Sequence, residues 1–482
     1  MTKRSKDSLI NAGLFLLMLV LSILGGIGQT SYFNYIAYVP LFFLLRRLEP
    51  VEALIYGFMY GLLLGAELQF WLSHFEKLDP FLMAMFSYAI VLAIVFATGS
   101  YLMRRYDKNT FIQIFAAGWI LYLMQVVVHY LWFAKAFIKI SNMQSFFDWV
   151  LPYLGTGIVE MLFVSFGCAV GLTIYVYIKK QSLAPVYPYL VFFAIMLGIG
   201  MYQDVVGLQP KNNSDTVKVA VIQGNFSWDW GQRVEYSQQI LDYYLDITNE
   251  VAQQGAQIVV WPEYAVAADI IDENKNLNDQ IVEASKKLDV VIVLGSLDRT
   301  NDKVIDTKWI GYDVSLVYDP VKGRLKPYRA VYPYSSNVLR GTEPMIFETK
   351  FGNFPVLSCF EIAHHKFVND YFHQGKQIDF VIAIANNQVF QGTNGYYRLE
   401  SHARRIAGEI NRYLLYVTNT GPTTILNHQG QTAARVPNDQ QGYLLYDVEK
   451  KSGNSVYSQL QEILPFLLTG GVFLYVFKKA KK

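Results

Sequence analysis

Long uncharged hydrophobic runs occupy the first two hundred residues of the chain. An α-helix needs roughly 20 apolar residues to cross the ~30 Å hydrocarbon core of a bilayer. We expect seven membrane-spanning helices before residue 205, at 9–26, 33–45, 51–71, 81–103, 111–133, 155–178 and 187–201. A shorter apolar run at 464–477 precedes a lysine-rich end and predicts an eighth span.

Basic residues fall in every second loop between these runs, and such residues concentrate in cytoplasmic loops. The pattern predicts a cytoplasmic N-terminus and places the end of the seventh span outside. Lys135 and Lys139 lie in a loop predicted to be outside and are discordant. The basic clusters that alternate in this way are Lys3/Arg4/Lys6, Arg46/Arg47, Arg104/Arg105/Lys108 and Lys179/Lys180.

The pattern changes between about residues 205 and 458. Short β-branched runs such as VKVAVIQGN, AQIVVWPEY and NFPVLSCFE predict buried strands, and amphipathic helical stretches alternate with them. This alternation is typical of an α/β core. We therefore expect a transmembrane domain at 1–204, a soluble α/β domain at 205–458, and a C-terminal span with a basic tail at 459–482.

Composition agrees with a membrane protein and excludes several functions. Hydrophobic residues make up 52% of the chain and charged residues 17%, against roughly 45–50% and about 25% in soluble domains. A net charge of +2 without a clustered basic face argues against nucleic-acid binding. Two cysteines, Cys168 and Cys359, cannot build a disulfide framework or a cysteine-rich zinc site. We expect no metal and no cofactor.

Two residues at the ends of predicted strands could carry chemistry. Glu263 in VVWPEY could be a general base, or a surface carboxylate in a loop. Cys359 in VLSCFE precedes a predicted helix, whose N–H groups and dipole would favour a thiolate nucleophile. Alternatively, Cys359 is only a small hydrophobic residue of the core, without a role in chemistry. Cys168 lies within a predicted span, where packing is the favoured interpretation.

A basic stretch, GRLKPYRAVYPY, follows another strand-like run. A cation from it near Cys359 and Glu263 could lower the thiol pKa or stabilise a tetrahedral oxyanion. A solvated loop is the alternative. His364 and His365 follow the cysteine, but their spacing does not predict a metal site.

The order of VIQGN, VVWPE, SCFEI and a late NTG resembles the carbon–nitrogen hydrolase (nitrilase) superfamily, whose members use a Glu, Lys, Cys triad in that order. With the flanking spans, the whole chain resembles its membrane-bound branch, the bacterial apolipoprotein N-acyltransferases. The resemblance implies an αββα sandwich for the soluble domain. It also implies that Glu263 is the base, Cys359 the nucleophile and Glu361 a supporting acid. Asn419, Thr420 and Gly421 match a structural turn, and Glu409 and Arg412 match a helical Glu-x-x-Arg.

The middle of the triad departs from the family pattern, a lysine shortly before Leu-Val-Pro-Phe-Gly-Glu. Counting back from Pro333 places Tyr328 where that lysine belongs. Lys326 comes two positions early and Arg329 one position late. We expect Lys326, or failing it Arg329, to supply the cation, whereas Tyr328 could donate one hydrogen bond. The family's later glutamate is replaced by Ser336 or a neighbour, and Val389 stands where a tryptophan is usual.

The resemblance implies a ping-pong acyl transfer in the bacterial inner membrane, with the catalytic domain facing the periplasm or cell exterior. A phospholipid would acylate the cysteine, and the α-amine of a lipidated lipoprotein would take the acyl group. No nucleic acid is expected as a partner, and the protein is expected to be a monomer. One alternative is a divergent acyltransferase or amidase with another acceptor. The other is a catalytically degenerate protein that binds lipid or lipoprotein.

Overall fold

A computed structural model describes residues 3–26, 32–74, 78–131, 145–206, 215–227, 235–266, 268–298, 304–305, 308–309, 311–333, 338–461 and 463–471. The chain divides into two compact units. One unit contains residues 1–206 and 460–482, and the other contains residues 207–459. Each unit has hydrophobic core clusters of its own.

The first unit is helical, and its helices have the apolar composition of a membrane domain. Among the described residues, 6 helices are long and apolar enough to cross a membrane. The chain is therefore a membrane protein, as its hydrophobic runs predict. The helices are α1 (Lys3–Gly26), α4 (Pro50–Gln69), α5 (Asp79–Arg105), α6 (Thr110–Leu131), α7 (Leu151–Ile178) and α8 (Tyr187–Val206).

The run at 33–45 does not form the single spanning helix that its hydrophobicity predicts. It forms two short helices, α2 (Phe33–Ala37) and α3 (Val39–Arg47). They are separated at Tyr38, and Pro40, which has no N–H to donate, lies at the start of α3. Burial of both helices explains their apolar sequence. Of the predicted eighth span, only the part up to residue 471 lies within the described residues.

Glycines allow α4 and α5 to pack closely. Gly57, Gly61 and Gly65 lie one helical turn apart on α4 and face α5. A methyl group at Gly61 would overlap the carbonyl oxygen of Tyr88, and one at Gly65 would lie 2.9 Å from Tyr88 Cβ. Small residues of this kind let membrane helices approach and gain van der Waals contact.

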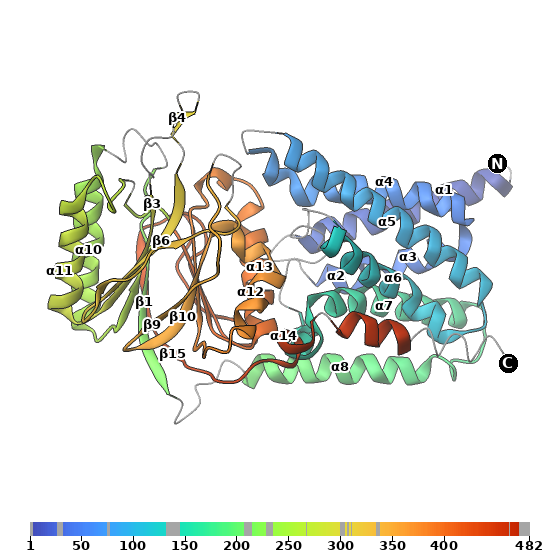
Figure 1. Ribbon diagram of the computed structural model, residues 1–482. Helices are drawn as coiled ribbons and strands as arrows, with labels where there is room; N and C mark the ends of the chain where they lie inside the picture. The colour runs from blue at the N-terminus through green and yellow to red at the C-terminus, as the bar shows by residue number, and fades with distance from the viewer. Residues whose placement is uncertain are drawn as a thin grey trace. The chain divides into compact units, whose positions relative to one another are not determined.

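The second unit contains two mixed sheets, shown as arrows in Figure 1. The first has the strand order β15-β1-β2-β3-β6-β7, with β8 also paired to β6. Its central strands β1, β2 and β3 are parallel, whereas β15 and β6 run antiparallel to their neighbours. The bounds are β1 (Thr216–Gln223), β2 (Ile258–Val260), β3 (Val291–Asp298), β6 (Tyr312–Asp319), β7 (Gly323–Arg324), β8 (Tyr328–Arg329) and β15 (Gly442–Glu449).

The second sheet has the order β14-β13-β12-β11-β10-β9, and its central strands β10, β11 and β12 are again parallel. The strands are β9 (Ile346–Thr349), β10 (Gly352–Ser358), β11 (Val381–Ala385), β12 (Leu414–Thr418), β13 (Thr424–Leu426) and β14 (Thr432–Arg435). A separate small ribbon pairs β4 (Val304–Ile305) with β5 (Lys308–Trp309).

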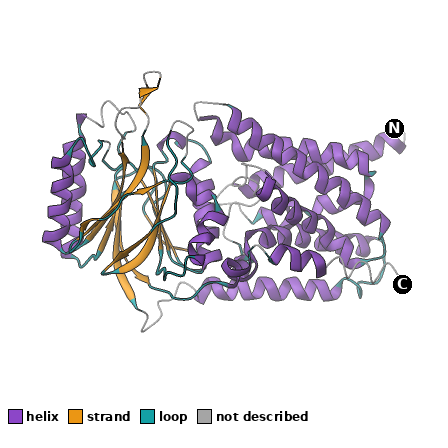
Figure 2. Ribbon diagram, in the orientation of Figure 1, coloured by secondary structure: helices purple, strands orange, loops and turns teal. Residues whose placement is uncertain are grey.

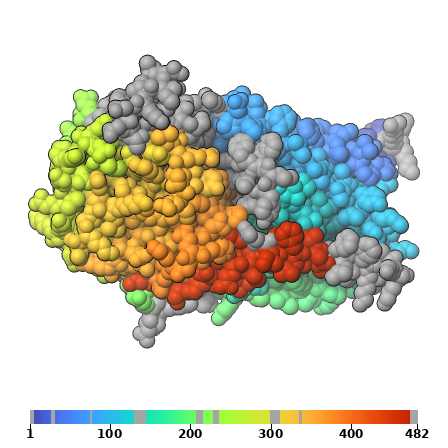
Figure 3. All heavy atoms as spheres, viewed as in Figure 1, coloured from blue at the N-terminus to red at the C-terminus, as the bar shows by residue number. Residues whose placement is uncertain are grey.

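The sheets face each other, and helices cover their outer sides (Figure 2). Alternating residues of β1 show this arrangement, since Val219 and Val221 lie in the core between the sheets. Ala220 and Ile222 instead join the core under the helices. The space-filling view shows the green side chains of α10 and α11 at the outer surface (Figure 3). The larger covering helices are α10 (Ser237–Gln253), α11 (Lys275–Leu288) and α13 (Gly395–Ile410).

Short helical segments connect these elements. They include α12 (His365–Asp370), α14 (Val456–Leu460) and the 3-10 helices η2 (Phe70–His74), η4 (Asp148–Val150), η5 (Cys359–Ala363), η6 (Tyr371–His373) and η7 (Gln388–Phe390). The two-sheet α/β architecture agrees with the fold predicted for this part of the chain. It also brings the carboxyl ends of parallel strands together, where α/β proteins commonly place functional groups.

Candidate active site

Residues that follow parallel strands of both sheets meet at one place. Glu263 comes three residues after β2, Cys359 follows β10, and Asn386 follows β11. The backbone N–H of Asn386 donates a 2.6 Å hydrogen bond to Oε2 of Glu263. The thiol of Cys359 lies close enough to the same carboxylate for each group to affect the pKa of the other. The two strand-end residues singled out in the sequence are thus neighbours in space.

Cys359 occupies an unusual backbone conformation. Its φ is 43°, in the left-handed region that residues other than glycine rarely adopt. The preceding residue, Ser358, is extended, and η5 begins at the cysteine itself. Conformations of this kind persist where surrounding structure enforces them, and they cluster at functional sites. The turn leaves the Cys359 side chain only 7% exposed.

A further acid, Asp313, joins this pair. It lies on β6 opposite Leu297 of β3, and its side chain is buried. Its carboxyl group contacts Glu263, and the Ser358 hydroxyl lies beside it. Sequence reasoning missed Asp313 because the run YDVSLVYDP reads simply as a strand. The available signal was an acid within an otherwise buried apolar pattern.

Burial dominates the electrostatics of this cluster. Burial raises the pKa of Asp313 to about 6. Burial, and then the charge of Asp313, raise the pKa of Glu263 well above its usual value. Burial and the two carboxylates also raise the pKa of the Cys359 thiol. The expected thiolate is therefore not stabilised here, because η5 is a single short turn and two acids face the sulfur.

Glu361 organises the turn around the cysteine. Its Oε2 accepts a 2.8 Å hydrogen bond from the N–H of Ser358. Its Oε1 accepts bonds from the Tyr328 hydroxyl at 2.6 Å and the Val331 N–H at 2.7 Å. Burial nevertheless raises the pKa of Glu361 to about 7, against the lowering effect of these donors. The glutamate thus ties the nucleophile turn to the loop after β8.

The structure places the basic residues of that loop elsewhere. The Lys326 side chain is 73% exposed, and its Nζ lies 3.2 Å from Oε1 of Glu343. Arg329 is 46% exposed and bonds Oδ2 of Asp298 at 2.7 Å. Neither side chain joins Glu263 and Cys359 in this structure, and the expectation that Lys326, or failing it Arg329, supplies the site's cation stays a prediction. The solvated-loop alternative describes Lys326.

Tyr328 fills the position counted for the family lysine. It is buried and lies opposite Ser315 of β6, and its hydroxyl donates a hydrogen bond to Glu361. In the described part of the chain, burial and acids provide the largest effects on the pKa of Glu263 and of Cys359, and no lysine or arginine is among them. The site is thus acidic where the family pattern calls for a cation.

Comparison with known proteins identifies this domain. A family model described as carbon–nitrogen hydrolase matches residues 218–456. The domain belongs to the carbon–nitrogen hydrolase family.

Named relatives extend the similarity beyond this domain. The chain is 26% identical over 327 residues to an apolipoprotein N-acyltransferase of Vibrio parahaemolyticus, covering 62% of each chain. It is 27% identical over 308 residues to one of Shewanella oneidensis, covering 57% of each. The matched regions thus span less than two thirds of these relatives. An amidase of the nitrilase superfamily from Nesterenkonia shares 13% identity with a TM-score of 0.40, covering 52% of this chain and 95% of that one.

Other motif residues of the carbon–nitrogen hydrolase domain support its loops. Asn419 pairs with the backbone of Phe226, donating to its oxygen at 2.8 Å and accepting from its N–H at 3.1 Å. Glu409 lies 2.9 Å from Nδ1 of His365. Arg412 donates to the Ile378 carbonyl at 2.7 Å. The Asn419 bonds join the segments that follow β1 and β12, the Glu409 contact joins α13 to α12, and the Arg412 bond joins the segments that precede β12 and β11.

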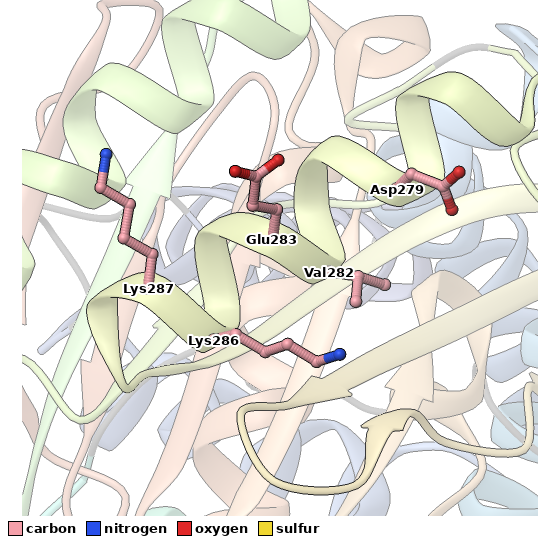
Figure 4. Close-up of a pocket in the computed structure, with 5 residues that line it drawn as sticks. All are labelled: Asp279, Val282, Glu283, Lys286 and Lys287. Carbon is pink, nitrogen blue, oxygen red and sulfur yellow. The ribbon is translucent and has the colours of Figure 1, made fainter.

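A pocket of the carbon–nitrogen hydrolase domain lies along α11, apart from the acid and thiol cluster. Its side chains all come from this one helix and point to different sides of it (Figure 4). They are Asp279, Val282, Glu283, Lys286 and Lys287. Within the described ranges, no group of three His, Cys, Asp or Glu residues could hold a metal ion. The groups of the acid and thiol cluster that could carry chemistry are the Cys359 thiol and the carboxyl groups of Glu263 and Asp313.

Proposed function

We propose that this protein is a membrane N-acyltransferase. It moves an acyl chain from a phospholipid, through a thioester on Cys359, to the α-amine of the lipidated N-terminal cysteine of a lipoprotein. The observation that carries the proposal is the Cys359 thiol beside the Glu263 carboxylate in a carbon–nitrogen hydrolase domain. Similarity to apolipoprotein N-acyltransferases supports the choice of donor and acceptor.

In the first half-reaction, the Glu263 carboxylate takes the Cys359 proton as sulfur attacks the ester carbonyl carbon. The carbonyl electrons move onto oxygen and form a tetrahedral oxyanion. When the oxyanion collapses, the ester C–O bond breaks and the leaving alkoxide takes the proton from Glu263. The products are a thioester on Cys359 and a lysophospholipid.

In the second half-reaction, the α-amine attacks the thioester carbonyl. Glu263 accepts a proton from the attacking nitrogen and returns one to the departing sulfur. An amide forms and the free thiol is restored. Because burial keeps the Cys359 thiol protonated at rest, proton removal during attack is the step that Glu263 must assist.

A membrane setting suits both substrates, since each carries acyl chains that dissolve in the bilayer. The alternating basic loops support a catalytic domain on the periplasmic or exterior face of the bacterial inner membrane. The proposed enzyme works as a monomer and needs no cofactor.

Purified full-length protein tests the proposal when it is incubated with phospholipid vesicles of one acyl composition and a synthetic diacylated lipopeptide. Mass spectrometry should detect the lipopeptide with one additional amide-linked acyl chain. Cys359→Ser is the inactive control. Donor consumption with Cys359 acylation but no lipopeptide product would contradict the proposed acceptor.

A divergent acyltransferase or amidase is the second candidate, and one observation favours it. The buried Tyr328 hydroxyl bonded to Glu361 occupies the position counted for the family lysine. Replacing the lipopeptide with other amines, alcohols or short amides separates this candidate from the first. Lipid binding without any covalent change at Cys359 would instead favour a non-enzymatic lipid-binding protein.

A further inference from the structure

Two buried carboxyl groups meet beside the Cys359 thiol, and no lysine or arginine of the described ranges is among the groups that shift their pKa. Glu263 and Asp313 are each 1% exposed and come from different elements of the first sheet. Oε1 of Glu263 and both carboxyl oxygens of Asp313 receive no backbone N–H among the described residues. Two ionised carboxylates in such a place repel each other strongly, and one shared proton removes that repulsion.

We propose that Asp313 is a positioning residue that shares one proton with Glu263, so that the pair carries a single negative charge until Glu263 receives the Cys359 proton. The inference rests on the proposed thioester chemistry at the same site. It makes Asp313 the residue that sets the net charge beside the Cys359 thiol.

The fold holds Asp313 in place for this role. Its carbonyl oxygen accepts a 2.9 Å hydrogen bond from the N–H of Ala330, and the pairing of β6 with β3 fixes its register. Its neighbour Val314 packs under the outer helices, so the alternation of side chains turns Asp313 toward the opposite sheet. Ser358, the residue before the nucleophile, lies beside it.

The groups that face the pair are neutral or acidic. They are the Cys359 thiol, the Ser358 hydroxyl, the Asn386 N–H and, from β12, Tyr416, whose hydroxyl accepts a 2.9 Å bond from Asn387. Burial raises the pKa of Asp313 to about 6, and the pKa of Glu263 is also raised. Interacting acids of this kind titrate as a pair rather than singly.

The shared proton stays with the pair throughout the acylation step. Glu263 receives the thiol proton as the C–S bond forms, and it passes that proton to the leaving alkoxide as the C–O bond breaks. The other proton stays shared between the two carboxyl groups. If the pair loses its last proton at high pH, the oxyanion must form beside an additional negative charge. Acylation of wild-type Cys359 should therefore fall at alkaline pH.

Alkylation of Cys359 by iodoacetamide tests the electrostatic coupling without requiring acyl transfer. Full-length protein in detergent is treated at pH values from about 5 to 10, and the Cys359 peptide is quantified by mass spectrometry. Asp313→Asn should move the alkylation midpoint to lower pH by about one unit, which gives roughly tenfold faster alkylation below the midpoint. Asp319→Asn is the matched control, because Asp319 is equally buried at the other end of β6. If wild-type acylation falls at alkaline pH, an unchanged midpoint in Asp313→Asn would overturn the proposal, because the fully ionised pair carries one more negative charge than Glu263 beside an Asn.

Acylation of Cys359 by a para-nitrophenyl ester separates Asp313 from Glu263. Whatever acylation rate it retains, Asp313→Asn should lose the alkaline fall, because the Asn amide donates to Glu263 at every pH. Glu263→Gln should lose acylation throughout the range. A wild-type alkaline fall retained in Asp313→Asn would refute the shared proton. Wild-type protein that is alkylated but never acylated would refute the proposed function instead.

A measurement that needs no Asp313 variant keeps the test available if Asp313→Asn does not fold. The infrared difference spectrum of wild-type protein between acidic and alkaline pH should contain a carboxylic-acid C=O band from the pair. Glu263→Gln should change that band, because Asp313 then faces a Gln amide instead of a second carboxyl group with which to share the proton. Identical bands in the two proteins would contradict a shared proton.

Discussion

The backbone N–H of Asn386 holds the Glu263 carboxylate through a 2.6 Å hydrogen bond. Asn386 follows β11 of one sheet, whereas Glu263 follows β2 of the other. The bond therefore joins the carboxyl ends of the two sheets next to the Cys359 turn. Because the donor is a backbone group, the orientation of the base depends on the register of the strands rather than on the identity of one side chain.

Gly295 provides the space that Glu263 needs. A methyl group at Gly295 would lie 2.6 Å from Cα of Glu263 and 3.0 Å from the Tyr264 nitrogen. Backbone atoms cannot move as easily as a side-chain end, so Gly295→Ala should displace Glu263 and slow Cys359 acylation at least tenfold, about 1.4 kcal/mol. Gly198→Ala is the control, since nothing lies within 4 Å of its added carbon. Equal acylation rates in the two variants would contradict this placement of Glu263.

Lys326→Ala should change the rate of Cys359 acylation less than about twofold. The Lys326 side chain is exposed and its partner is the equally exposed Glu343, and surface pairs of this kind contribute only about 0–1 kcal/mol. Single-turnover acylation measured by mass spectrometry checks the prediction. A loss of about tenfold or more would mean that Lys326 reaches the thiol during the reaction.

Tyr328→Phe should lower stability through Glu361. The Tyr328 hydroxyl is one of the donors to this buried carboxyl group, and leaving a buried acceptor short of a donor costs about 1–3 kcal/mol. Thermal unfolding of the full chain should begin at a lower temperature than in the wild type. Tyr236→Phe, at an exposed position, should leave the transition unchanged. A Tyr328→Phe transition equal to that of the wild type would show that this bond contributes little.

Stability should fall as pH rises from about 4 to 7. Burial raises the pKa of Asp313 to about 6 and of Glu361 to about 7. The folded state therefore binds these protons more tightly than the unfolded state. Their contribution is complete below the unfolded values near pH 4 and is lost as pH passes the folded values. Thermal unfolding across this range should show a smaller fall in Asp313→Asn than in the wild type, and identical slopes would contradict the raised pKa of Asp313.

The sequence predicts those parts of the site that depend on local pattern. Glu263 and Cys359 each follow a buried apolar run, and a strand end is recognisable without the rest of the fold. Asp313 could not be found in this way, because its role depends on a contact between β6 and the end of β2. The exposed position of Lys326 could not be foreseen, because spacing along a loop does not determine which side chains turn inward. The run at 33–45 was misread because two short buried helices are as apolar as one membrane span.

Detection of an acyl group on Cys359 tests the central claim most directly. Full-length protein is incubated with phospholipid vesicles of one acyl composition, and its peptides are analysed by mass spectrometry with and without hydroxylamine. We predict the donor's acyl mass on the Cys359 peptide, lost on hydroxylamine treatment, absent in Cys359→Ala and unchanged in Cys168→Ala. A hydroxylamine-sensitive acyl group that persists elsewhere in Cys359→Ala, or an unmodified Cys359 while lipid is consumed, would contradict the account.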